Sequence, residues 1–164
     1  MGIHVNTFLA ANLAHQLGSK INIYLEDDII VSTDVLRLVD QFIVSQKPGM
    51  LCLRRWHKTQ ETNNPNLVQP ALHGLLGNGF AWESKYWTNN IRPWWFVIDS
   101  KCGGFMWDWS VSYGLDLQGI QQWRPMINRS QNIGIHGTHN NAGTDLNHFG
   151  ELYTGPTVEH FEFV

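Results

Sequence analysis

Charged residues are scarce in this sequence, and neither sign dominates. Lysine and arginine number 11 against 14 aspartates and glutamates, and the formal net charge is −3. This balance lacks the basic surface that nucleic-acid binding requires, so we expect no nucleic-acid partner. Hydrophobic residues nevertheless make up 43% of the 164 residues. That fraction excludes a disordered chain and predicts a folded protein with a sizeable core.

Long hydrophobic runs and cysteines are also few. No apolar run reaches the length of a transmembrane helix, and the first residues lack the layout of a signal peptide. We therefore expect a soluble protein without a membrane span, with the cytoplasm as its simplest compartment. The two cysteines, Cys52 and Cys102, are expected to be buried or half-buried thiols, because the pattern gives no support for a disulfide. No repeat or linker divides the chain, which predicts a single domain over residues 1–164.

The order of the predicted elements is that of an α/β sheet with crossovers. The first half is predicted to hold a helix over 8–17 that stops at Gly18, a strand over 21–25, a helix capped by Thr33, and a strand over 50–53. The second half is predicted to hold a loop over 57–70, helices over 83–90 and 105–117, a strand over 124–127, a loop over 128–143 and a helix over 145–153.

The feature with the most chemical content is an apolar, β-prone segment that ends in Glu26, Asp27 and Asp28. Three adjacent carboxylates repel one another, so stability alone does not explain them. A divalent cation such as Mg²⁺ or Mn²⁺ prefers oxygen ligands and also binds substrate phosphates. Because ligands bind at the carboxyl ends of strands in open α/β sheets, the acids predict a metal–diphosphate site in a strand-to-helix loop. A solvated acidic turn beside the dipole of the next helix is the alternative.

Tryptophan is plentiful, with 8 residues, most of them between positions 82 and 109. A bulky aromatic core is the default interpretation for most of them. Aromatic rings also stack on the apolar faces of sugars, so one or two tryptophans could line a sugar pocket. The candidates are Trp82, Trp95 and Trp107.

Three motifs stand in an order that resembles a known family. They are Tyr24-Leu25-Glu26-Asp27-Asp28, Gly77-Asn78-Gly79-Phe80-Ala81-Trp82 and Phe105-Met106-Trp107-Asp108-Trp109. Together they resemble the GT-A glycosyltransferases, and among these the N-acetylglucosaminyltransferase I-like enzymes. Arg129-Ser130 and Gly134-Ile135-His136-Gly137 stand where that family has a late loop with an arginine and a Ser-His-Gly-like element. The likeness spans nearly all of this chain but only the later part of the family's catalytic domain.

The resemblance implies a GT-A-like α/β fold, in which a mixed central sheet is flanked by helices and the N-terminal nucleotide-binding strands are lacking. It implies an inverting glycosyltransferase that moves a hexosyl or N-acetylhexosaminyl group from a nucleotide-sugar donor to a glycan or other hydroxyl acceptor. The expected cofactor is Mn²⁺ or Mg²⁺, bound directly by Asp28. Glu26 and Asp27 would contact the donor's ribose or the waters around the metal.

The resemblance also assigns the remaining site residues. Asp108 would be the general base, strengthened by the apolar walls of its neighbouring tryptophans, with a helix cap as its alternative role. Gly77 and Gly79 would allow the backbone to approach a sugar closely. Arg129 would hold phosphate oxygens. His136, in competition with His139, would be a second metal ligand or a diphosphate contact.

Two other functions are compatible with the sequence. A chain without the nucleoside-holding strands could be a non-catalytic carbohydrate- or nucleotide-binding module on a truncated GT-A core. The histidine-rich tail would suit a metal-dependent hydrolase, which would release its product without an acceptor. A truncated sheet would also leave an edge or face that a homodimer or a partner chain covers.

Overall fold

A computed structural model describes residues 3–54, 64–71, 79–97, 107–133 and 151–164. The helices within these ranges are α1 (Ile3–Gln16), α2 (Val35–Val44) and α3 (Trp107–Leu117), and a run of 3₁₀ and π turns covers residues 84–94. The strands are β1 (Ile21–Tyr24), β2 (Ile29–Val31), β3 (Met50–Cys52), β4 (Leu67–Ala71), β5 (Phe80–Glu83), β6 (Gln122–Pro125), β7 (Ser130–Asn132) and β8 (Glu162–Phe163).

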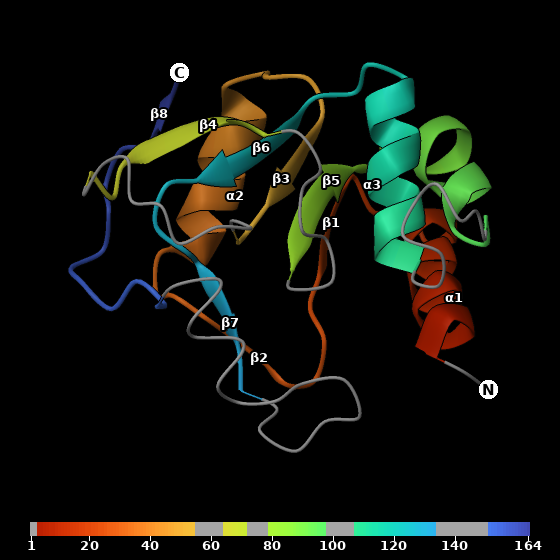
Figure 1. Cartoon of the computed structure of the whole chain (residues 1–164), viewed down its shortest axis with the longest axis horizontal. Helices are drawn as coiled ribbons and strands as arrows, with labels where there is room; N and C mark the ends of the chain where they lie inside the picture. The colour runs from red at the N-terminus through yellow and green to blue at the C-terminus, as the bar shows by residue number, and fades with distance from the viewer. Residues whose placement is uncertain (1–2, 55–63, 72–78, 98–106, 134–150) are drawn as a thin grey trace.

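Six of these strands form one mixed sheet in the order β1-β5-β3-β6-β4-β8. The pairs β3–β6 and β4–β8 are parallel, whereas β1–β5, β3–β5 and β4–β6 are antiparallel. A separate antiparallel ribbon joins β2 to β7, and it extends below the sheet in Figure 1. The prediction of a mixed α/β sheet with flanking helices is confirmed.

The two faces of the sheet carry two cores, because side chains alternate along each strand. On β3, Met50 and Cys52 belong to one core together with residues of α1 and α3, whereas Leu51 belongs to the other together with α2. Figure 1 accordingly shows α2 apart from α1 and α3, which lie together at the β1 end of the sheet. The α1–α3 core contains most of the buried tryptophans.

Several predicted elements are confirmed with small shifts of their ends. The first helix stops before Gly18, whose φ of +79° is a conformation that favours glycine. The second helix begins one residue later than expected, because Asp34 and not Thr33 stands at its N-cap. Cys52 is a buried free thiol, as expected, and burial raises its pKa to about 12. Cys102 lies outside the described residues.

Other predicted elements were wrong where pairing, and not local pattern, decides the structure. Residues 67–70 of the predicted loop belong to β4, and residues 130–132 of the next predicted loop form β7. Both strands are short and carry little apolar alternation, so their partners fix them. Residues 151–153 are not helical, and Leu152 instead forms a bridge with Asn128. Among the described residues, no helix is both long and apolar enough to cross a membrane.

Candidate functional site

The structure brings Asp108 to the acidic run, although about 80 residues of sequence separate them. The acids follow β1, and Asp108 lies in the first turn of α3. Tyr24 links the two elements, because its hydroxyl donates to Glu26 Oε1 at 3.3 Å while its ring packs edge-on against Trp107 at 5.1 Å. Phe80 of β5 lies against both of these rings. The aromatic cluster therefore holds the end of β1 beside the start of α3.

Electrostatics show the same proximity. The pKa of Glu26 rises from its ordinary 4.5 to about 7, first because the carboxyl is partly buried and then because of the charge of Asp28. The charges of Asp108 and Asp27 raise the pKa further, and the hydrogen bond from Tyr24 opposes the rise. Burial and Glu26 together raise the pKa of the Tyr24 hydroxyl above its usual value. These four carboxylates, Glu26, Asp27, Asp28 and Asp108, are called the acidic cluster below.

The acidic cluster fits a hydrated cation better than a fully dehydrated one. Asp28 Oδ1 is buried and has no hydrogen-bond partner within the described part of the chain, a costly state that a cation or water would relieve. Yet among the described residues no three carboxylate, imidazole or thiolate groups come together as a ready-made metal site. Mg²⁺ commonly binds through one or two carboxylates and keeps its waters and substrate phosphates.

The Glu26–Asp28 run does not lie in the strand-to-helix loop that the sequence predicted. They occupy the connection from β1 to β2, closed by a hydrogen bond from the Ile29 N–H to the Glu26 carbonyl, and α2 begins only after β2. The predicted strand-to-helix loop is therefore wrong. In addition, β1 stands at an end of the strand order that the described residues form.

Gly79 lies directly against the end of β1. Its φ is +103°, and a Cβ added there would stand 3.1 Å from Leu25 Cδ2, 3.2 Å from Leu53 Cδ1 and 3.6 Å from the Tyr24 carbonyl oxygen. The close approach that the sequence assigned to a sugar is thus made to the protein's own chain, one residue before the acidic cluster. Gly77 lies outside the described residues.

The three tryptophans proposed for sugar stacking are core residues. Trp82, Trp95 and Trp107 are between 1% and 4% exposed. Trp95 and Trp107 stack on each other with centroids 4.3 Å apart and planes at 10°, and Trp82 stacks on Phe80. Their rings therefore offer no open face to a sugar in this structure. The sugar-stacking prediction is replaced by the core interpretation, because large rings gain more by mutual burial.

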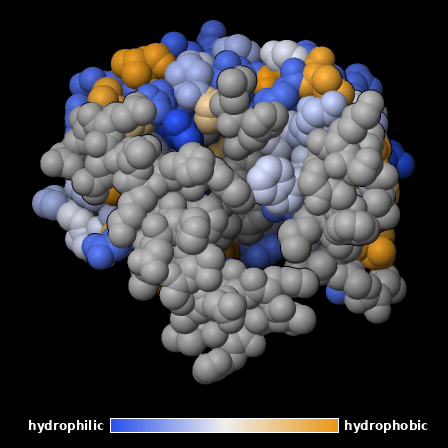
Figure 2. Space-filling model, in the orientation of Figure 1, coloured by the Kyte–Doolittle hydropathy of each residue, from blue (hydrophilic) through white to orange (hydrophobic). Residues whose placement is uncertain are grey.

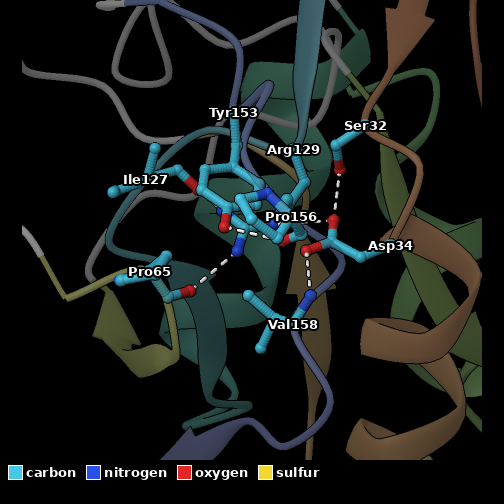
Figure 3. Close-up of polar contacts among 8 residues, drawn as sticks. All are labelled: Ser32, Asp34, Pro65, Ile127, Arg129, Tyr153, Pro156 and Val158. Carbon is cyan, nitrogen blue, oxygen red and sulfur yellow. Dashed lines mark hydrogen bonds and ion pairs between the residues drawn. The ribbon is translucent and has the colours of Figure 1, made fainter.

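Arg129 is also a structural residue and not an open phosphate contact. Its side chain is 0% exposed, and its Nε lies 2.9 Å from Asp34 Oδ1 in an equally buried ion pair. Its Nη1 and Nη2 each donate at 2.7 Å, to the carbonyls of Ile127 and Pro65. Figure 3 shows the guanidinium enclosed by these partners and by the Tyr153 ring, whose centroid lies 4.1 Å away.

Sequence reasoning missed two residues of this region. Asp34, the partner of Arg129, is 95 positions away from it in the sequence. No pattern in either segment predicts that the two side chains form an ion pair. Tyr24, which joins Glu26 to Trp107, stands in a predicted strand and in the first quoted motif but receives no role of its own from the sequence, although a phenol next to an acidic run is a usable signal. His136 and His139 lie outside the described residues.

Fold and site together define a mixed α/β protein with an acidic cluster where β1, at one end of the described strand order, meets the first turn of α3. A scan of the sequence against models of protein families finds no match. A search among curated proteins finds no significant relative either. The GT-A likeness therefore rests on the motifs quoted above.

Proposed function

We propose that this chain is a metal-dependent inverting glycosyltransferase that uses the acidic cluster to bind a nucleotide-sugar donor. The observation that carries the proposal is the meeting of Asp108 with the Glu26–Asp28 run. The likeness to the family predicted a catalytic base in one segment and a metal ligand in another. The charges of Asp28, Asp108 and Asp27 all raise the pKa of Glu26, so their repulsion opposes this arrangement on grounds of stability alone.

Each acidic residue of the run has its own role in the proposed donor site. Asp28 carries the buried oxygen that has no hydrogen-bond partner among the described residues, and it is the direct ligand of Mn²⁺ or Mg²⁺, which when bound would neutralise the departing diphosphate. Glu26 and Asp27 flank it and hold waters or the donor's ribose. Arg129 and the three buried tryptophans have no role in this proposal, because their side chains are enclosed by the protein.

In this proposal Asp108 accepts the proton of the acceptor hydroxyl. It lies in the first turn of α3, next to the buried Trp107 ring, which fixes the position of its backbone. A general base must be a carboxylate within hydrogen-bond reach of the attacking hydroxyl, on the side of the sugar opposite the leaving group.

The cation role is tested by Asp28→Asn. This variant keeps the side-chain shape and removes the charge, so we expect cation-dependent nucleotide binding to fall at least about tenfold in isothermal titration, the size of one lost charged ligand. Asp40→Asn, which alters an exposed acid on α2, is the matched control and should bind like wild type. Unchanged binding in Asp28→Asn would remove Asp28 from the metal site.

The base role is tested by Asp108→Asn. We expect donor binding to persist while transfer to an acceptor falls by about 10²–10⁴-fold, which is the usual contribution of general acid–base catalysis. Asp116→Asn, on the same helix but at its other end, is the control. Equal losses of binding and transfer in Asp108→Asn would count against the base assignment. Binding by wild type without any transfer would instead favour a non-catalytic binding module.

A further inference from the structure

The outer edge of β1 is an exposed strand edge. Among the described strands β1 pairs only with β5, so its other edge has no strand partner there. The Ser84 N–H donates to the Lys20 carbonyl, and β1 pairs with β5 in the register Asn22↔Trp82 and Tyr24↔Phe80. Because hydrogen-bonding direction alternates along an antiparallel strand, Ile21, Ile23 and Leu25 direct their backbone groups outward. The Ser19 hydroxyl bonds to the Ile21 carbonyl at 2.7 Å, which agrees with this direction.

The side chains along this edge are apolar and exposed. Ile21, Ile23 and Leu25 are 40%, 37% and 41% exposed. On the face shown in Figure 2, described apolar residues form small groups among hydrophilic ones. Natural sheets usually protect an edge with charges, proline or a bulge. This strand has none of these between residues 21 and 25.

We propose that two copies of the chain pair along β1, antiparallel, with Ile23 opposite Ile23 of the partner subunit. In this register Ile21 stands opposite Leu25 of the partner subunit, so all three apolar residues find apolar partners. The outward backbone groups of Ile23 then meet those of its counterpart as a hydrogen-bonded pair. The same register sets Lys20 opposite Glu26 of the partner subunit, in a non-hydrogen-bonded pair whose side chains are close.

Charge complementarity favours a second copy over other occupants. The residue before the strand is basic, and the residue just past its apolar row is acidic. An antiparallel two-fold arrangement joins these two unlike ends twice, and moving the register by two residues breaks the Lys20–Glu26 match. The arrangement also brings Lys20 of the partner subunit to the acidic cluster, so each copy would add a positive charge to the other's candidate site. The inference does not depend on the proposed function.

The surface is tested by sedimentation equilibrium of the full chain from micromolar to near-millimolar concentration. Wild type should show a reversible monomer–dimer equilibrium, weak because the interface is short. Ile23→Lys should shift the chain to monomer, because it puts two like charges at the two-fold axis. Ile30→Lys is the matched control, since Ile30 is 40% exposed on β2, outside the proposed interface. A wild-type chain that stays monomeric, or a dimer that Ile23→Lys leaves intact, would overturn the proposal.

The register is tested by exchanging charges. Lys20→Glu and Glu26→Lys each turn two attractive cross-strand pairs into repulsive ones, so each alone should weaken self-association about tenfold. Mixed together, the two variants should form a heterodimer at about wild-type affinity, because each then faces the opposite charge. Circular dichroism of each variant confirms that it is folded. A mixture that associates no better than either variant alone would overturn the register.

Discussion

At the scale of single residues, surroundings and not identity decide what the acids of this chain do. Glu26 and Asp40 are both ordinary acids in the sequence. Glu26 is partly buried beside three other carboxylates, and its pKa rises to about 7, whereas Asp40 is exposed on α2. A carboxyl with a pKa near neutrality exchanges its proton readily, which is a frequent property of functional sites.

This pKa makes the stability of the free protein depend on pH. The folded value of about 7 lies above the ordinary 4.5, so between these pH values the folded state binds more protons than the unfolded state. Stability from this group is therefore complete below pH 4.5 and is lost as the pH rises through 7. Glu26→Gln should be more stable than wild type at pH 8 by about 1–2 kcal/mol, after allowance for solvent screening, and should gain little at pH 4.

Urea unfolding of both proteins across this pH range, without added cations, measures the difference. Asp40→Asn is the control for removing a negative charge outside the acidic cluster. A constant difference between Glu26→Gln and wild type at all pH values would show that Glu26 is not influenced by its neighbours as described.

At the scale of elements, the buried ion pair of Arg129 and Asp34 joins three parts of the chain. Asp34 stands at the start of α2 and accepts from the Ser32 hydroxyl at 2.6 Å. Its second oxygen lies 3.4 Å from the Val158 N–H, and Arg129 comes from the segment between β6 and β7 (Figure 3). The pair thereby attaches the C-terminal segment to α2 and to the β2–β7 ribbon.

Loss of one partner should be costly, because the other charge stays buried. Arg129→Ala should lower the free energy of unfolding by about 3–5 kcal/mol. Arg37→Ala is a matched control, since Arg37 also joins α2 to the C-terminal segment through Glu159 but is exposed. That control should cost less than about 1 kcal/mol. Chemical denaturation checks both values. A stable Arg129→Ala that had lost nucleotide binding would restore the phosphate role and refute the structural one.

At the scale of the whole molecule, periodicity and caps predicted the elements that local sequence determines. The three helices and the strands β1 and β3 were predicted close to their observed positions, whereas the strand predicted over 124–127 overlaps β6 only at residues 124 and 125. Strands such as β4 and β7 were missed because their pairing partners define them, across distances that no local pattern records. In the same way, the meeting of Asp108 with the acidic run followed only from a resemblance to a family. The burial of Arg129 followed from neither source.

The most direct test of the central claim is thermal unfolding of the purified chain with a cation, a nucleotide, and both. The cations are Mn²⁺ and Mg²⁺, and the nucleotides are UDP, GDP, CMP and their sugar forms. A ligand that binds the folded state raises its stability by mass action, by about 2.7 kcal/mol at a hundred times the dissociation constant. We predict that one nucleotide raises the midpoint temperature only when the cation is present, and that Asp28→Asn loses this effect. Equal shifts without a cation, or no shift with any nucleotide, would contradict a metal-dependent donor site at the acidic cluster.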